Sequence, residues 1–440
     1  MQTQHLSYSR VLYLAVPIIL AGLTQPLMSA VDTAIAGHLP GPHYLAGVAV
    51  GSLLFNLIFW AFGFLRMGTT GVVAQYFGTA QPMAALLAVC RGIVMALLLG
   101  LLILFAQGPL IQGGLAWLGA SLEAAEQAQL YAYGRVWSAP LVLVNYVILG
   151  WLLGCQRVKT ALLIQLLINV VNFLAVITLV YGWGWGVQGI GAATAVADLS
   201  GASVGAVLLW RQYRQQLKDM RWSAVFEATE LRRQIQINSH IFIRTACLLA
   251  TMSWFTHLGA KQGDVLLATN AILLNFLSFT SYGLDGFAHA AETLSGAAVG
   301  QGKPKQLRRV VHVCLVWGLV GALLYTLVYS LFGGALVRLL TDQYLIVQSA
   351  EQYLIWLVLA PLISMPAYLY DGVFMGATRT YSLMLIMLAC SFSFLCLSWL
   401  LLPLFGNHGL WISFLVFNAA RGLGLAVAFK PIVLRPLARA

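Results

Sequence analysis

The sequence contains very few charged side chains. Lys and Arg number 24 and Asp and Glu number 13, which is 8 % of the 440 residues, against about 25 % in a typical soluble domain. Apolar residues make up 60 % and the mean hydropathy is +0.86. Because so few charges cannot cover a water-exposed surface, the composition excludes a soluble enzyme, a disordered chain and a disulfide scaffold. It predicts an all-α integral membrane protein.

The sequence also lacks the short motifs of catalytic, metal and nucleotide sites. Its six Cys form no CxxC pair, and its eight His show no metal-ligand spacing. A Walker A motif, a nucleophile elbow and an HExxH sequence are all missing. We therefore predict no metal site, no cofactor and no enzymatic activity, and ATP-driven transport within this chain is unsupported.

Twelve apolar runs of about 20 residues are long enough to cross a membrane as helices. They lie at 11–36, 46–66, 87–107, 132–154, 160–180, 188–210, 238–258, 266–290, 310–333, 351–374, 381–402 and 408–428. The sequence therefore predicts twelve transmembrane helices in a multi-pass protein whose solvent is the lipid bilayer.

The basic side chains fall mainly on one side of these predicted spans. With the N-terminus inside the cell, 19 of the 24 Lys and Arg, Arg91 and Arg421 among them, lie on the inner side, and only Lys261 and Arg338 lie outside. A miscounted helix would destroy this asymmetry, because every later loop would change sides. We therefore predict cytoplasmic termini, and we attribute the net charge of +11 to topology and not to a nucleic-acid partner. The remaining basic residues fall in or near spans: Arg66, Arg135 and Arg244.

The longest inner loop divides the chain into two halves of six helices each. We predict an N-terminal lobe at 1–210, a cytoplasmic linker loop at 211–237 and a C-terminal lobe at 238–440. Because six is an even number, both halves enter the membrane in the same direction. Two such lobes are expected to be related by a pseudo-two-fold axis along the membrane normal.

Short sequences recur between the halves at a constant offset of 222 residues. The recurring residues lie at equivalent places on the cytoplasmic side, after the second and fourth predicted spans of each half. The matches are Gly78 and Pro82 with Gly300 and Pro304, and Gly154-Cys-Gln-Arg157 with Gly376-Ala-Thr-Arg379. The repeat favours a two-lobed carrier, although chance matches in short loops are the alternative explanation.

Five of the 13 acids fall within predicted spans or at their ends, where a charge costs about 2.5–3.5 kcal/mol on insertion scales. Such acids usually face a protein interior or a cavity, which makes them candidates for contact with an ion, a proton or a substrate. They are Asp32, Asp198, Asp285, Glu292 and Asp371.

The first half holds a predicted polar cluster around Asp32 and Asp198. Burial disfavours the charged form of such acids, so they are candidates for proton coupling. Pro17 and Pro26 precede Asp32 in the first span and are possible bend points of that helix. The alternative role for both acids is structural, with the carboxylate held permanently by hydrogen bonds. The uncharged members of the cluster, candidates for substrate contact, are Asn145, Asn169, Asn172 and Thr194.

The second half contributes three acids and Arg244 to a predicted cavity. Asp285 and Glu292 are seven residues apart and therefore share one face of a helix. Asp371 follows two prolines in its span, and Arg244 is the expected counter-charge in this half. A structural pair between Arg244 and an acid is the competing explanation, and Glu292 alternatively marks the cytoplasmic end of its helix.

Several sequence motifs resemble the multidrug and toxic compound extrusion (MATE) family of transporters over essentially the whole chain. They are VDTAIAGHL (31–39), FLRMGTTGVVAQYFG (64–78), GWLLGCQ (150–156) and GATRTY (376–381). A fifth motif, LDGFAHAAE (284–292), resembles the DinF-type bacterial branch in particular. The resemblance implies a twelve-helix, two-lobed antiporter that exports cationic or amphipathic compounds, with Asp32 as the coupling carboxylate.

The resemblance leaves the coupling ion open between protons and sodium. Several relatives carry an acid four residues after the residue that matches Asn172, where this chain has Val176. Some have an acid in the first helix of the second half, where this chain has Arg244. Both differences favour a proton gradient over sodium. A lipid-linked precursor flippase is a further alternative, because such carriers share the two-lobed plan.

The resemblance also implies the setting in which the protein works. We expect a monomer in the bacterial inner (cytoplasmic) membrane, with small cationic or amphipathic molecules and protons as its partners.

Overall fold

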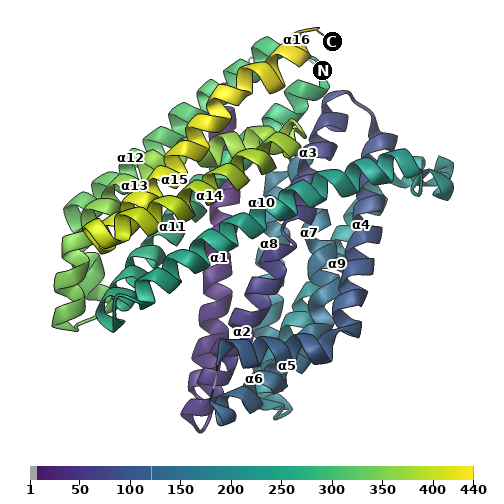
Figure 1. The fold of residues 1–440 in the computed structure, drawn as a ribbon. Helices are drawn as coiled ribbons and strands as arrows, with labels where there is room; N and C mark the ends of the chain where they lie inside the picture. Colours follow the sequence, from purple (N-terminus) through teal and green to yellow (C-terminus); the bar gives the residue numbers. More distant parts are fainter. Residues whose placement is uncertain (1–6, 120, 440) are drawn as a thin grey trace. The chain divides into compact units, whose positions relative to one another are not determined.

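The computed structural model describes residues 7–119 and 121–439, except for the side chains of residues 25–30 and 439. The described part of the chain consists of helices joined by short connections and contains no strand (Figure 1). The helices of the first half are α1 (Tyr8–Gly37), α2 (Pro42–Ala61), α3 (Phe64–Gly78), α4 (Pro82–Phe105), α5 (Gln107–Leu118), α6 (Leu122–Arg135), α7 (Ala139–Gly154), α8 (Val158–Ile177) and α9 (Gly186–Asp219). Those of the second half are α10 (Ala228–Ala260), α11 (Asp264–Gly300), α12 (Pro304–Leu340), α13 (Tyr344–Gly376), α14 (Thr380–Phe405), α15 (Asn407–Ala428) and α16 (Arg435–Arg439).

The predicted membrane spans are confirmed in position. Among the described residues, eleven helical segments are long and apolar enough to cross a membrane, and each coincides with one predicted run from 46–66 to 408–428, although the segment Pro82–Phe105 ends two residues before the run 87–107 does. The first predicted run, 11–36, lies within α1, whose described apolar part is Tyr8–Thr24. The apolar runs did not predict α5, which follows α4 almost directly. The chain is thus a multi-pass, all-α membrane protein.

The chain forms two compact units that divide it differently from the predicted lobes. We call residues 20–238 the N-unit, and residues 1–19 with 239–440 the C-unit. The beginning of α1 belongs to the C-unit, because Gly286 of α11 lies against Ala15 and Ile19. The side chain of Trp317 in α12 also donates a hydrogen bond to the carbonyl oxygen of Tyr8 at 3.1 Å.

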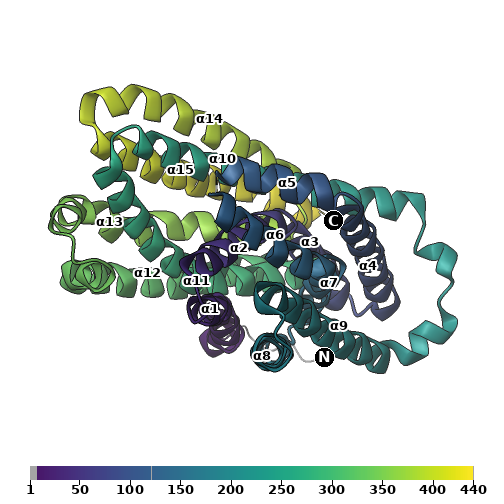
Figure 2. The same cartoon turned by 90° about the horizontal axis from the view of Figure 1, so that it is seen from below.

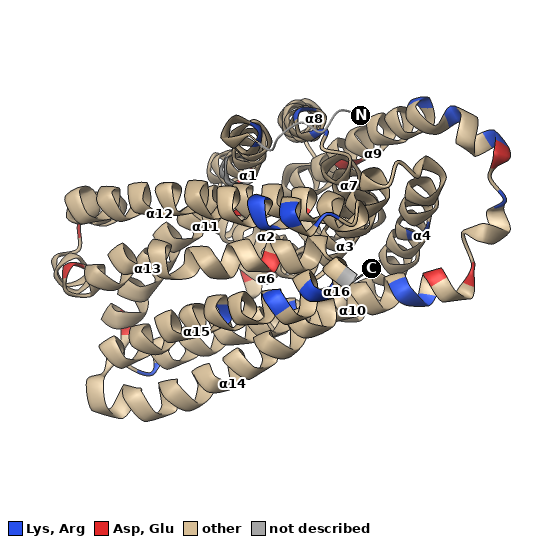
Figure 3. Cartoon of the chain, turned by 90° about the horizontal axis from the view of Figure 1, so that it is seen from above, with Lys and Arg blue, Asp and Glu red and all other residues tan. Residues whose placement is uncertain are grey.

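The predicted linker loop at 211–237 is mostly helical. α9 continues to Asp219 and α10 begins at Ala228, since Arg, Gln, Lys and Leu in these stretches are good helix formers. Only residues 220–227 lie between the two helices, and they include a short 3₁₀ turn, Trp222–Ala224. Figure 3 shows Lys, Arg and acidic residues along this connection from α9 to α10.

Two of the basic residues assigned above to the inner side are buried. Arg91 in α4 is 4 % exposed, and Arg421 in α15 is 1 % exposed. Arg91 donates to the carbonyl oxygens of Val225 at 3.0 Å and Ala224 at 2.7 Å, and so fixes the connection to α4. Both arginines lie inside predicted spans. A guanidinium in such a place is positioned by its partners within the protein.

The sequence repeat is visible in the helix–helix turns. α3 ends at Gly78 and α11 at Gly300, and in each turn the residue two positions later has a positive φ: 54° at Ala80 and 65° at Gly302. The turns after α7 and α13 match in the same way, with φ of 60° at Gln156 and 52° at Thr378. These positions are 222 residues apart, so the offset found in the sequence also relates backbone conformations.

The repeat extends to the way helices pack. Gly150 and Gly154 of α7 lie against the backbone of α3, at Arg66 and Thr70. Gly372 and Gly376 of α13 lie against the backbone of α11, at Ala288 and Glu292. A Cβ atom at any of these glycines would overlap the facing helix. Such small-xxx-small spacing lets membrane helices approach closely without a hydrophobic driving force.

Each unit is a bundle of neighbouring helices. In the N-unit, α7 packs on α3, α4 and α9, and α8 packs along α9. Figure 2 shows α8 and α9 side by side. In the C-unit, α11, α12 and α13 pack on one another, and α15 packs on α13 and α14.

Candidate functional site

The predicted polar residues of the first half are carried by four helices of the N-unit. All are buried except Asn169, which is half-buried. Their helices are α1 for Asp32, α7 for Asn145, α8 for Asn169 and Asn172, and α9 for Thr194 and Asp198.

Asn145 and Asp198 are in direct contact. The side-chain amide nitrogen of Asn145 donates to the backbone oxygen of Asp198 at 3.0 Å and to its carboxylate Oδ1 at 3.3 Å. A hydrogen bond to the carboxylate stabilises its charged form and offsets part of the cost of burying it. The contact joins α7 to α9.

The other amides of the cluster make separate contacts. Asn172 donates to the hydroxyl oxygen of Thr194 at 3.4 Å, which links α8 to α9. Asn169 donates to the backbone oxygen of Thr24 in α1 at 3.4 Å and accepts a bond from Gln165. The structure therefore shows separate contacts that join α7 to α9, α8 to α9 and α8 to α1.

Asp32 is 3 % exposed, and its carboxylate Oδ1 makes no hydrogen bond with any residue that the structure describes. An unpaired, buried carboxylate oxygen is costly, so native proteins rarely keep one without a functional reason. Such an oxygen can accept a proton, a cation or a donor group of a substrate. This property distinguishes Asp32 from Asp198, whose carboxylate already accepts a bond from Asn145.

Sequence reasoning left one member of this site, Arg135, without a role. Its guanidinium interacts electrostatically with both Asp32 and Asp198. It donates a hydrogen bond to the hydroxyl oxygen of Tyr131 and lies over the rings of Phe55 and Phe59 at 5.6 and 5.9 Å. The sequence did contain a signal for this role, because Arg135 falls inside the predicted span 132–154, where a charge is expected to have a partner.

The predicted bend of the first helix involves Pro17 and Pro26. α1 is helical from Tyr8 to Gly37, and Pro17 is half-buried within it. The side chain of Pro26 lies outside the described residues. The boundary between the C-unit and the N-unit falls between Ile19 and Leu20, and therefore between the two prolines.

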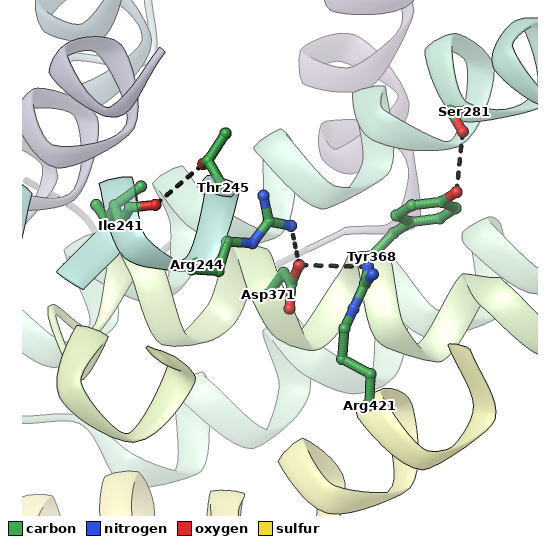
Figure 4. A network of polar contacts seen from close by, with 7 residues as sticks. All are labelled: Ile241, Arg244, Thr245, Ser281, Tyr368, Asp371 and Arg421. Carbon is green, nitrogen blue, oxygen red and sulfur yellow. Dashed lines mark hydrogen bonds and ion pairs between the residues drawn. The ribbon is translucent and has the colours of Figure 1, made fainter. Parts of the chain in front are cut away.

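In the C-unit, Asp371 of α13 is the centre of an ionic cluster (Figure 4). The guanidinium of Arg244 in α10 donates directly to its carboxylate Oδ2. Nη2 of Arg421 in α15 lies 3.3 Å from the same oxygen. The structure thus pairs Arg244 with Asp371 and adds Arg421. We call Arg244, Asp371 and Arg421 the C-unit ionic cluster.

The remaining acids of the second half lie along α11. Glu292 is fully buried, and its carboxylate Oε2 lies 3.0 Å from Nδ1 of His289, with which it forms a hydrogen bond. Asp285 is half-buried and interacts electrostatically with Tyr282 and Tyr368. Within the described part of the chain, no group of three or more His, Cys, Asp or Glu residues is arranged to hold a metal ion.

Two segments of the chain, residues 17–178 and 240–400, match the family model described as MatE. The first residues of the two segments are nearly as far apart as the repeated sequences are. Each half of the chain therefore carries one copy of the matching segment.

Two relatives illustrate the similarity along the full length. The chain is 38 % identical over 424 residues to DNA damage-inducible protein F of Escherichia coli (strain K12), covering 95 % of this chain and 91 % of that protein. It is 24 % identical over 434 residues to multidrug resistance protein NorM of Vibrio vulnificus (strain YJ016), covering 95 % and 94 %.

The fold is also that of solved MATE structures. A crystal structure of MATE in the bent conformation matches with a TM-score of 0.89 at 19 % identity, over 98 % of this chain and 97 % of that one. An outward-facing multidrug resistance MATE family transporter of the MOP superfamily matches with a TM-score of 0.88, also at 19 % identity and with the same coverage. The chain therefore belongs to the MatE family, whose members are transporters and not enzymes.

Proposed function

We propose that this chain is a multidrug efflux antiporter that exports cationic or amphipathic compounds in exchange for protons. Transport proceeds by alternating access, and Asp32 is the coupling carboxylate. The observation that carries the proposal is the buried Asp32 with an unpaired Oδ1, which interacts electrostatically with the guanidinium of Arg135. The relatives named multidrug resistance proteins support export of drug-like molecules.

The proposed cycle follows from the charge of Asp32. When ionised, the carboxylate attracts a cationic substrate, and aromatic side chains of the N-unit add apolar and cation–π contact. When a proton from the outer side neutralises Asp32, that attraction is lost and the substrate leaves. Asp198 is the second proton-coupling candidate, and Asn145, Asn169, Asn172 and Thr194 are the candidates for substrate contact. Bending of α1 near Pro17 and Pro26 accompanies the change.

A sodium-coupled antiporter is the second candidate. Two features of the chain weigh against it. In the C-unit, Asp371 already faces the guanidiniums of Arg244 and Arg421, and these fixed positive charges oppose a bound cation. In the N-unit, the apolar side chain of Val176 is fully buried one helical turn after Asn172 and offers no ligand.

A lipid-linked precursor flippase is the third candidate. It would have to bind pyrophosphate, and the buried Arg244 and Arg421 are the observation in its favour. The N-unit favours cations instead, because Asp32 presents an unfilled acceptor oxygen. We regard the drug antiporter as the better supported function.

We further propose that the protein is a monomer in the bacterial inner membrane with both termini in the cytoplasm. In support, the basic residues Lys303, Lys305, Arg308 and Arg309 lie at the beginning of α12, and all four are exposed. Exposed clusters of this kind are typical of cytoplasmic ends of membrane helices.

The proposal is tested by transport in proteoliposomes, with ethidium as a cationic aromatic probe. We expect a proton gradient to drive ethidium transport by the wild-type chain and an equal sodium gradient to leave it at the background rate. Asp32→Asn keeps the size of the side chain but cannot release a proton, so proton-driven transport should fall to background.

The matched control is Glu351→Gln. Glu351 is an exposed acid that pairs with Arg338 at 2.8 Å, so its neutralisation should leave transport unchanged. Wild-type coupling in Asp32→Asn would show that Asp32 is not the coupling carboxylate. Transport driven equally well by sodium would contradict proton specificity.

A further inference from the structure

The C-unit ionic cluster contains many more hydrogen-bond donors than acceptors. Each guanidinium offers five N–H groups, whereas Asp371 offers one carboxylate. Arg244 and Arg421 both approach the same oxygen, Oδ2. Nε of Arg244 and Nε of Arg421 are buried and make no hydrogen bond with the described residues, and Oδ1 of Asp371 is likewise unfilled. The cluster is therefore incompletely satisfied.

Another polar network of the C-unit is more completely bonded. Asn270 and Asn407 exchange two side-chain hydrogen bonds, at 2.8 and 3.0 Å. The indole nitrogen of Trp411 adds a third bond, to Asn270, at 2.9 Å. A purely structural network is expected to reach this state, because each unfilled buried donor destabilises the fold.

The two arginines differ in their surroundings. Arg421 is 1 % exposed, and its guanidinium lies over the rings of Tyr368 and Phe417 at 5.6 and 5.7 Å. The hydroxyl of Tyr368 is held by Ser281 at 2.9 Å, which fixes the ring (Figure 4). Arg244 is 8 % exposed, so part of its surface is accessible. Figure 4 shows one of its terminal nitrogens directed away from Asp371.

We propose that Arg244 and Arg421 form a binding site for the carboxylate or sulfonate group of an aromatic, amphipathic substrate. An oxyanion fills the free donors of planar guanidiniums with charge-assisted, bidentate hydrogen bonds. The half-buried ring of Tyr368 supplies apolar surface for the aromatic part. As a substrate site, this inference rests on the proposed export function and extends it from cations to acidic and zwitterionic compounds.

Asp371 has a definite role in this site. It is the internal anion that holds the two arginines when no ligand is present, and it competes with an incoming oxyanion for the same donors. Neutralising Asp371 should therefore strengthen anion binding. A merely structural cluster predicts no change in anion affinity, only a loss of stability.

The test is binding of three probes to the purified full-length chain in lipid nanodiscs: 2-naphthoate, its neutral analogue 2-naphthamide, and inorganic pyrophosphate. We expect the wild type to bind 2-naphthoate about tenfold more tightly than 2-naphthamide, because charge-assisted hydrogen bonds are about twice as strong as neutral ones. Asp371→Asn should increase this preference. Arg421→Lys, which keeps the charge but loses the planar fork, should reduce it.

The control is Arg338→Lys at the exposed pair with Glu351, which should leave the preference unchanged. Thermal unfolding establishes whether each variant is folded. If a variant is not folded, the preference of the wild type for 2-naphthoate over 2-naphthamide tests the site by itself. Equal affinity for the two naphthalene probes, or tighter binding of pyrophosphate than of 2-naphthoate, would overturn the proposal. The binding measurement needs no ion gradient. A failure of the anion-site proposal is therefore distinguishable from a failure of the proton-coupled export proposal.

Discussion

The side chain of Asn145 bonds two oxygens of one residue, the backbone oxygen and the carboxylate of Asp198. The two residues are 53 positions apart, on α7 and α9, and both are buried. The amide thus stabilises a buried acid and fixes the spacing of two helices at the same point.

Replacing Asn145 should therefore destabilise the N-unit. We expect Asn145→Leu to lower the free energy of unfolding by about 1–3 kcal/mol, because it leaves the Asp198 carboxylate without its donor. Thermal unfolding in detergent measures the effect. Asn169→Leu is the matched comparison, since Asn169 is half-buried and its bonds are 3.4 Å long, and it should cost less. Equal losses in both variants would argue against a special role for the contact with Asp198.

Arg135 should set the pH range in which transport works. Its positive charge favours the ionised forms of Asp32 and Asp198, so Arg135→Gln removes that influence and favours their protonated forms. We expect the pH profile of ethidium transport to move to higher pH. Arg135→Lys keeps the charge and should keep the profile near that of the wild type. An unchanged profile in Arg135→Gln would show that this guanidinium has only a packing role.

Exchanging Ala and Gly in the two repeated turns should change the unfolding temperature in opposite directions. Ala80 and Gly302 occupy equivalent positions with φ of 54° and 65°, a region that costs a non-glycine residue about 1–2 kcal/mol. Both positions are exposed, and no atom would contact a Cβ added at Gly302. We expect Ala80→Gly to raise and Gly302→Ala to lower the unfolding temperature. Shifts in the same direction would contradict the equivalence of the turns.

Arg91 should hold the connection between α9 and α10 in place. Arg91→Gln removes both bonds to the backbone at Ala224 and Val225. We expect faster cleavage by trypsin after Arg221, which is exposed at the beginning of this connection. Arg211→Gln, at an exposed position of α9, is the control and should leave that cleavage unchanged. Unchanged cleavage in Arg91→Gln would mean that other contacts are sufficient, such as the bond from Gln234 to Ala88 at 3.1 Å.

Hydrophobicity and short-range patterns made much of the fold predictable. A helix in lipid must satisfy its own backbone, so the apolar runs marked the positions of the helices. Gly78 with Gly300 and Gly154 with Gly376 marked the ends of repeated helices, because turns impose strict local conformations. The helical extensions of α9 to Asp219 and of α10 from Ala228 were missed, because their polar residues leave no apolar signal.

The sequence by itself determined which acids are embedded and therefore in need of an explanation, since a charge in an apolar run is costly wherever it lies. Only the tertiary structure decided their partners. It put Arg135 within electrostatic reach of Asp32 and Asp198, and it brought Arg421, 50 residues further along the chain, to Asp371. Side-chain pairing depends on which helix faces which, and that arrangement follows from packing over the whole unit, which no local pattern encodes.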